Sequence, residues 1–248
     1  MLGGLGTLIV TSPGWDAVRH DFFSWYWFRN SFPGLLSAFW LDVRMFLILE
    51  AIVLVFALLV ALCRNSRAPA FFPLRLVATV YTDLFRGIPT ILLIALFGFG
   101  IPGLQITGVP TDPLVLGGAA LVLSYSAYVA EVYRAGIDSV HGGQMAAALA
   151  VGLTRGQAMR HVVVPQAVRR VLPPLLNDFI SLQKDVALLS IIGVIEVFRQ
   201  AQIDADYHFN STPIVGAALL YICITIPLAR MLDRMSARAR SRREAVMM

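Results

Sequence analysis

Residues 143–167 read GQMAAALAVGLTRGQAMRHVVVPQA, and this stretch predicts two short helices joined by a tight turn. Alanine, the best helix former, fills much of Gln144–Val151. We expect Gly152 to end this first helix, because glycine readily takes the left-handed conformation just past a helix C-terminus. One face of the helix carries only methyl groups, which belong to Ala146, Ala147, Ala148 and Ala150. Another surface can therefore approach the helix backbone closely.

The second short helix begins after Thr154. Gln157 stands three residues further on, so the two side chains predict a T-x-x-Q capping box. We expect this helix to end at Pro165, because proline cannot donate to the helix ladder. From the residues alone the helix pair has two interpretations: a docking element for a partner protein, or an amphipathic segment that lies on a membrane surface.

The composition indicates a membrane protein. Of the 248 residues, 58% are hydrophobic and 14% are charged, whereas about 25% of the residues in soluble domains are charged. The net charge of +5 would also suit a nucleic-acid-binding protein, but the basic residues lie between apolar runs, as in membrane proteins. We therefore expect no nucleic-acid partner. The two cysteines and four histidines lack metal-ligand spacing, so we expect no metal site.

Five apolar segments are candidate membrane helices, each of which needs about twenty residues to cross a bilayer. They are residues 45–63, with residue 35 as the earliest start, and residues 87–104, 113–130, 179–194 and 212–229. Polar residues predict a loop at 64–75 and another at 199–210. We thus expect an all-α membrane protein with about five transmembrane helices.

The segments at the two ends differ from this apolar domain. Residues 22–28 hold six aromatic side chains in seven positions, and tryptophan and tyrosine favour the membrane–water boundary. We assign residues 1–34 to an extracytoplasmic or interfacial segment. Residues 35–235 form the membrane domain, and residues 236–248 form an arginine-rich cytoplasmic tail.

The arginines predict the orientation of the chain. Residues 64–75 hold three, residues 134–170 hold five, and the chain from residue 230 onward holds six, against about four on the opposite side. Loops rich in lysine and arginine stay in the cytoplasm. We therefore expect the stretch 143–167 and the C-terminus inside and, with five spans, the N-terminus outside.

Polar residues inside the apolar segments are candidates for a solute path. Glu50 is the only charge within residues 45–63, and an acid at that depth should face protein or water. It is either a path residue or a packing acid that hydrogen-bonds to a neighbouring helix. Tyr125 and Ser126 belong to a polar stripe near the end of residues 113–130 and are further path candidates.

The stretch 143–167 resembles the EAA loop of permease subunits in bacterial ATP-binding-cassette (ABC) importers. The family pattern is E-A-A-x-x-x-G, followed about nine residues on by an aliphatic residue and L-P. The alanines, the glycine and the end of this pattern correspond to Ala147, Ala148, Gly152, Val162, Val164 and Pro165. The chain departs from the pattern at Ala146, which stands where the family has glutamate.

Three further motifs are similar to those of the polar amino-acid branch of these permeases, and the resemblance covers roughly residues 35–235. They comprise Arg86, Gly87 and Pro89 in LFRGIP, Glu131, Arg134 and Gly136 in AEVYRAGI, and Lys184 with Asp185. Glu131 and Arg134 also have the i, i+3 spacing of a helical ion pair. We expect Lys184 and Asp185 at the membrane interface or at a subunit contact.

The resemblance implies a type I importer permease that carries a polar amino acid or a related solute. It also implies that the first short helix docks in a groove of a separate ATPase subunit. The docking residues would be Gln144, Ala146, Ala147, Ala148, Gly152, Leu153, Thr154 and Pro165. This chain has no P-loop pattern G-x-x-x-x-G-K-[ST]. We therefore expect that it is not an enzyme, and that ATP and Mg²⁺ bind the ATPase subunit.

The implied partners are ABC ATPase subunits, an extracytoplasmic solute-binding protein, membrane lipid, and a second permease chain that is either a copy or a similar protein. The implied location is the bacterial cytoplasmic (inner) membrane. Two other classes stay open on the sequence. A secondary, ion-coupled amino-acid carrier would usually show inverted repeats and mid-span charges, and an intramembrane enzyme would need paired acids or metal ligands.

Overall fold

The described part of the chain is almost entirely helical. The structure is a computed structural model that describes residues 10–66, 68–140 and 142–247, so nine residues of the expected N-terminal segment and the last residue of the expected tail lie outside it. The helices are α2 (Trp15–Phe22), α3 (Trp25–Asn65), α4 (Phe72–Gly87), α5 (Thr90–Ala95), α6 (Ile101–Gly103), α7 (Pro113–Asp138), α8 (Gly142–Ala150), α9 (Arg155–Ala158), α10 (Val164–Asp185), α11 (Val197–His208) and α12 (Thr212–Met247). Turns of 3-10 helix cover Pro69–Phe71 and Val186–Ile192, and π-helical turns cover Leu96–Gly100 and Met159–Val163.

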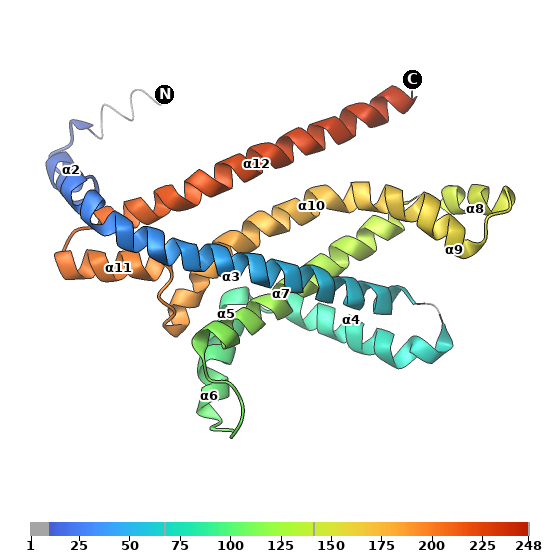
Figure 1. Cartoon of the computed structure of the whole chain (residues 1–248), viewed down its shortest axis with the longest axis horizontal. Helices are drawn as coiled ribbons and strands as arrows, with labels where there is room; N and C mark the ends of the chain where they lie inside the picture. The colour runs from blue at the N-terminus through green and yellow to red at the C-terminus, as the bar shows by residue number, and fades with distance from the viewer. Residues whose placement is uncertain (1–9, 67, 141, 248) are drawn as a thin grey trace.

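The long helices extend between two ends of the molecule (Figure 1). One end holds α2, α11 and the starts of α3 and α12, whereas α8, α9 and the end of α12 lie toward the other. Three helical stretches are long and apolar enough to cross a membrane, Trp15–Asn65, Pro113–Asp138 and Thr212–Met235. Two further pairs of helical pieces, Pro69–Gly87 with Thr90–Gly103 and Arg155–Ile192 with Val197–His208, are bent, and each pair could cross a membrane only as one span. The described residues therefore supply between three and five spans.

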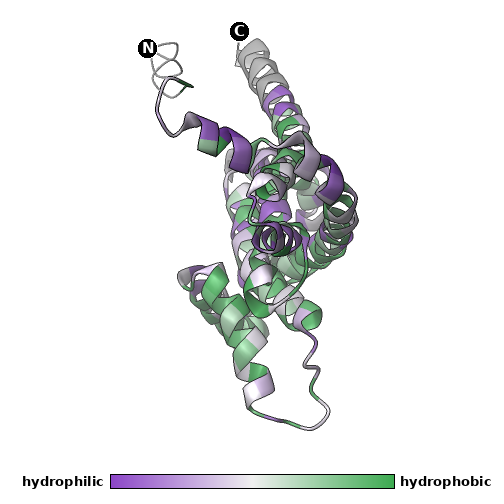
Figure 2. Ribbon diagram, turned by 90° about the vertical axis from the view of Figure 1, so that its left-hand side faces the viewer, coloured by the Kyte–Doolittle hydropathy of each residue, from purple (hydrophilic) through white to green (hydrophobic). Residues whose placement is uncertain are grey.

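Large apolar side chains cover the outer faces of these helices. On α3 they include Leu47, Val55 and Leu59, each more than half exposed. Figure 2 shows hydrophobic residues along the ribbon of most of the bundle. Soluble monomers rarely expose apolar patches of this extent, whereas lipid covers them in a bilayer. The expected all-α membrane fold is therefore confirmed.

The first span is longer than the sequence predicts. α3 has 41 residues and begins at Trp25. Its buried face continues outward through Leu35 and Phe39, which pack against α11 and α12 in a second apolar cluster. Packing thus extends the helix beyond the uniformly apolar run on which the prediction rested. The expected boundary at residue 34 lies inside α3.

The second expected span, residues 87–104, starts at a sharp bend that separates it from α4. α4 ends at Gly87, α5 begins at Thr90, and the two helical pieces meet at 101°. A proline disfavours helical backbone at the residue before it, and Ile88, which precedes Pro89, is extended with φ −98° and ψ 127°. The loop expected at 64–75 is correspondingly short, because α4 already starts within it.

Two expected chain breaks are helical in the structure. The second short helix does not end at Pro165, which occupies the first turn of α10, where a missing N–H needs no helical partner. The prediction of a loop at 199–210 is also wrong, because most of these residues belong to α11. The Glu196 side chain caps that helix, because it accepts hydrogen bonds of 2.7 Å from the backbone amides of Phe198 and Arg199.

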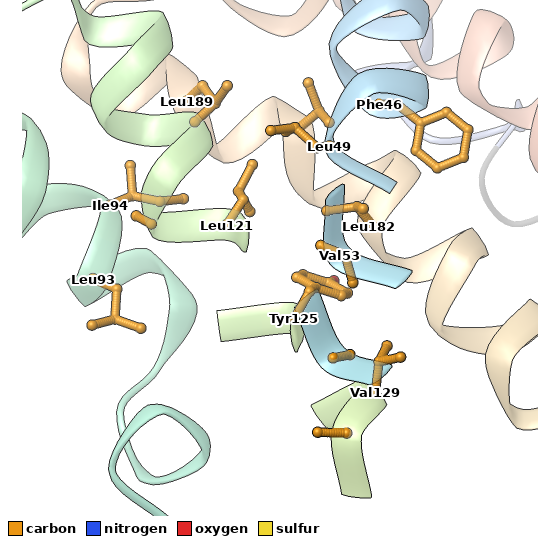
Figure 3. Packing of buried hydrophobic residues seen from close by; sticks show 14 of the residues in the cluster. Phe46, Leu49, Val53, Leu93, Ile94, Leu121, Tyr125, Val129, Leu182 and Leu189 are labelled. Atoms are coloured by element: carbon orange, nitrogen blue, oxygen red, sulfur yellow. The ribbon is translucent and has the colours of Figure 1, made fainter. Parts of the chain in front are cut away.

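The main apolar core lies where α3, α5, α7 and α10 meet (Figure 3). Leu49 of α3, Leu121 of α7 and Leu182 of α10 are buried there, beside Leu189 of the 3-10 turn after α10. α7 approaches that turn closely, because a β-carbon at Gly117 would stand 2.4 Å from Leu189 Cδ2. Small residues permit such close contact between membrane helices.

Candidate functional site

The short helix α8 ends as the sequence predicts. Gly152 has a φ of +90°. Its amide donates to the Leu149 carbonyl over 3.0 Å, and the Leu153 amide donates to the Ala148 carbonyl over 3.2 Å. These two bonds form the Schellman pattern that closes a helix through a left-handed residue. A β-carbon at Gly152 would meet no atom within 4 Å, so only the backbone conformation favours glycine there.

The start of α9 is confirmed as well. The Gln157 amide donates to Thr154 Oγ1 over 3.3 Å, and the Thr154 amide donates to Gln157 Oε1 over 2.9 Å. This reciprocal pair is the capping box. The Gly152 turn and the capping box together fix how the chain leaves α8 and enters α9.

α8 lies near one end of the molecule (Figure 1), and most of its exposed residues are small. Ala146, Ala147 and Ala150 are exposed, whereas Ala148 is buried. α9 and the π-helical turn after it contact α8. Val151 follows immediately and is 79% exposed. A helix whose exposed side is methyl groups and one aliphatic chain suits close docking against a partner surface.

The crossing of α7 and α10 carries the α8–α9 pair. Gly136 of α7 is buried, and a β-carbon there would stand 1.9 Å from Val171 Cγ1 of α10. The Arg170 guanidinium donates to the Ser139 carbonyl just beyond α7. Gln144 of α8 accepts a hydrogen bond from a glutamine of α10 over 3.4 Å. The helix pair is thus attached at both of its ends to one close helix crossing.

An ionic network joins α3 to α7 beside this crossing. The predicted pair of Glu131 and Arg134 is present. Arg64, at the end of α3, also donates to Glu131 over 2.8 Å, and Arg134 reaches Asp138 over 2.6 Å. No local pattern predicts the Arg64 contact, because its partner stands 67 residues away in the sequence.

The Arg86-Gly87-Pro89 motif lies at the bend between α4 and α5 and faces α7. The Tyr128 hydroxyl donates to the Arg86 carbonyl over 3.1 Å, and the Arg86 guanidinium carbon lies 5.7 Å from the centre of the Tyr128 ring. The motif therefore attaches the bend to the polar stripe of α7. Within the described residues it contacts no part of the α8–α9 pair through any hydrogen bond or ion pair.

The remaining candidate residues, apart from Lys184, are buried or half-buried in the bundle. Asp185 accepts a hydrogen bond from the Tyr125 hydroxyl over 2.8 Å, whereas Lys184 is exposed. Ser126 is fully buried. Glu50 is 8% exposed, and it makes no hydrogen bond or ion pair with any described residue.

Residues 53–241 match the family described as the binding-protein-dependent transport system inner membrane component. The chain belongs to this family. The match covers the second part of α3 and every later span, and it includes the α8–α9 pair. The residues of LFRGIP, AEVYRAGI and the 143–167 stretch all lie within it.

Individual members of the family are similar over most of their length. The probable glutamine ABC transporter permease protein GlnM of Bacillus subtilis (strain 168) is 39% identical over 168 residues, which are 66% of this chain and 74% of that protein. The arginine transport system permease protein ArtQ of the same organism is 32% identical over 197 residues, or 79% and 88%. The crystal structure of an amino acid ABC transporter with histidines superposes with a TM-score of 0.75 at 31% identity, over 83% of this chain and 94% of that chain.

This family member is a permease subunit of an ABC importer, with the type I importer permease fold. The alternative of a secondary carrier is wrong, because the structural neighbours are ABC importer permeases. The chain is not an enzyme: ATP hydrolysis takes place in a separate subunit of these importers. It is a multi-pass protein of the inner membrane and works with ATPase and solute-binding partners.

Proposed function

We propose that this chain forms the translocation path for a polar amino acid and that α8 transmits the motion of the ATPase subunit to that path. The observation that carries the coupling role is the exposed methyl surface of α8, held at a fixed angle by Gly152 and Thr154. Support for the solute comes from the glutamine and arginine permeases to which the chain is similar.

The mechanical argument rests on how α8 is attached. Its two ends lead into α7 and α10, which cross at Gly136 and Val171, so a displacement of α8 moves both membrane helices together. ATP and Mg²⁺ would bind the ATPase subunit and drive that displacement. The proposed docking residues are Gln144, Ala146, Ala147, Ala148, Gly152, Leu153, Thr154 and Pro165. Of these, Ala148 is buried, and Pro165 lies in the first turn of α10 rather than at the end of the second short helix.

The assembly that we propose contains a second permease chain, identical or similar, two ATPase subunits and an extracytoplasmic solute-binding protein. Its orientation places α8 and the end of α12 in the cytoplasm, and α2 and α11 on the outer side. The excess of arginines near α8 and in the tail from residue 230 supports this orientation. The exposed apolar side chains of α3 would face lipid.

The test is transport by the assembled importer. Vesicles that contain the permease, its ATPase subunit and the solute-binding protein should take up a labelled polar amino acid only when ATP is present on the ATPase side. The purified permease should hydrolyse no ATP by itself. Uptake of no amino acid with any candidate binding protein would contradict the proposed solute, and hydrolysis by the contaminant-free permease would contradict the division of labour.

A further inference from the structure

The ionisable side chains buried inside the bundle are all acidic. Among the described residues, Asp42 is 2% exposed, Glu50 is 8% exposed and Glu196 is fully buried, whereas no lysine, arginine or histidine is buried. Asp178 of α10 is half-buried near Glu50. An ionisable residue within a membrane span faces the protein interior or a water-filled cavity and commonly marks a solute path.

None of these acids has a cationic partner in the described structure. The three ion pairs found there all involve Glu131 or Arg134 at the other end of the bundle. Arg44, two residues from Asp42, is exposed and lies over the Trp40 ring. Lys184 is exposed as well. Burial of a carboxylate without a counter-ion is costly, so the bundle interior favours the arrival of a positive charge.

Asp42 and Glu196 form the outer of two acid pairs. Tyr221 donates to Asp42 Oδ2 over 3.0 Å, while Oδ1 has no hydrogen-bond partner among the described residues. Glu196 is held at the start of α11 by two backbone amides, close enough to Asp42 for their charges to repel. One oxygen of the Asp42 carboxylate therefore lies in the interior without a hydrogen bond, although the Val197 amide stands near this carboxyl group.

Glu50 and Asp178 form the inner pair, eight residues further along α3, which is about 12 Å of helix rise. The two side chains lie close enough for their charges to interact, where α3 packs against α10. Asp178 Oδ2 is a second buried oxygen without a hydrogen-bond partner in the described part of the chain. Phe46 and Phe179 pack edge to face between the two pairs, with ring centres 4.4 Å apart.

We propose that the transported solute is an amino acid with a cationic side chain, and that the Asp42–Glu196 and Glu50–Asp178 pairs receive that charge in turn. This step rests on the proposed function. An ammonium or guanidinium group supplies both the missing counter-ion and the donors for the two unused carboxylate oxygens. A neutral amino acid offers only its α-ammonium group, whose charge its own carboxylate balances, and an acidic amino acid has a net negative charge that the four acids disfavour.

Binding to the purified permease–ATPase complex tests this assignment. Equilibrium dialysis should show that labelled arginine or lysine binds more tightly than glutamine or glutamate. Asp42→Asn and Asp178→Asn keep the side-chain shape and remove the charge, so each should weaken arginine binding by about tenfold or more, the loss expected for a charge-assisted hydrogen bond. Asp206→Asn is the matched control, because Asp206 is an exposed acid on α11 and its loss should leave arginine binding unchanged.

The comparison of wild-type affinities does not depend on whether the variants fold. Tighter binding of glutamine than of arginine by the wild-type complex would overturn the proposed cationic solute and leave the importer function in place. Unchanged arginine affinity in both folded variants would overturn the role of the acid pairs. Failure of the complete importer to take up any amino acid would instead count against the proposed function itself.

Discussion

Gly136 of α7 lies so close to Val171 of α10 that a β-carbon on the glycine would stand 1.9 Å from Val171 Cγ1. This contact sets the distance between the two helices that lead into and out of the α8–α9 pair. A real β-carbon never approaches another carbon so closely, so any larger residue at Gly136 must push α10 away or turn the valine side chain. The orientation of α8 relative to the membrane helices therefore depends on a glycine that does not belong to α8.

Gly136→Ala should destabilise the complex by about 1–3 kcal/mol, the usual cost of overpacking. In a Val171→Ala background the same substitution should be neutral or stabilising, because alanine is the better helix former and the clash is gone. Thermal unfolding of the purified complex for the two single variants and the double variant measures this reversal of sign. Equal destabilisation of Gly136→Ala in both backgrounds would show that Val171 is not the reason for the glycine.

Arg64→Met should destabilise the complex more than Arg134→Met does. Arg64 is 13% exposed and provides the ionic link between α3 and α7, whereas Arg134 is 36% exposed and shares its helix with Glu131. Because Glu131 is itself 22% exposed, we expect only about 1 kcal/mol from the Arg64 contact. Thermal unfolding at low and high salt measures the effect, and the difference between the variants should shrink in high salt. A larger loss for Arg134→Met would mean that the pair within α7 dominates.

Local signals in the sequence predicted local structure well, and they failed where distant residues decide. The Gly152 turn and the Thr154 capping box depend on neighbours within five residues, so both can be predicted from the sequence. The early start of α3 depends on packing against α11 and α12, and the contact of Arg64 with Glu131 joins residues 67 positions apart. The predicted helix end at Pro165 is wrong because a proline is tolerated in the first turn of a helix as well as after the end of one.

The same limit applies to the interior of the bundle. Glu50 stood out as a single acid in an apolar run, and the sequence could not show that Asp178 faces it from α10. Asp42 precedes the uniformly apolar run at 45–63, where a charge is not unusual in the sequence, yet the structure buries it beside Glu196. Only the helix arrangement reveals that these acids meet one another rather than a base.

Cysteine labelling should report the proposed orientation. In a variant whose Cys63 and Cys223 are replaced by serine, Gly142→Cys on α8 should stay protected from a membrane-impermeant maleimide in whole cells, whereas Asp206→Cys on α11 should react. Both positions are exposed in the structure, so a difference reflects the membrane. Permeabilised cells provide the control, because both cysteines should then react. Labelling of both positions in intact cells would contradict the topology.

Ala146→Glu should strengthen the association with the ATPase subunit if the missing family glutamate weakens docking in this chain. Position 146 is exposed at the middle of α8, the fifth of its nine residues, and the helix dipole acts mainly within the first turn, so a carboxylate here gains less than the about 0.3–1 kcal/mol of an N-terminal site. The expected gain in affinity is therefore at most severalfold, and titration of the purified permease with the ATPase subunit measures it. Ala150→Glu, at the last residue of the same helix, is the matched control and should not improve binding. Equal affinities for wild type and Ala146→Glu would show that the position simply tolerates either residue.

Gly152→Asp should weaken the ATPase interaction or uncouple hydrolysis from transport while all spans remain inserted, because Gly152 lies outside them. A side chain at its φ of +90° costs about 1–2 kcal/mol in backbone strain. Gly152→Asn should be milder, since asparagine tolerates positive φ better than most residues. Co-purification of the ATPase subunit and substrate-stimulated ATP hydrolysis are the measurements. Gly156→Asp is the control for added charge: Gly156 lies in α9, has open space around it and does not have a positive φ. If Gly156→Asp were as damaging as Gly152→Asp, charge on the docking surface would be the cause. If Asn were worse than Asp at position 152, the left-handed turn would not explain the glycine.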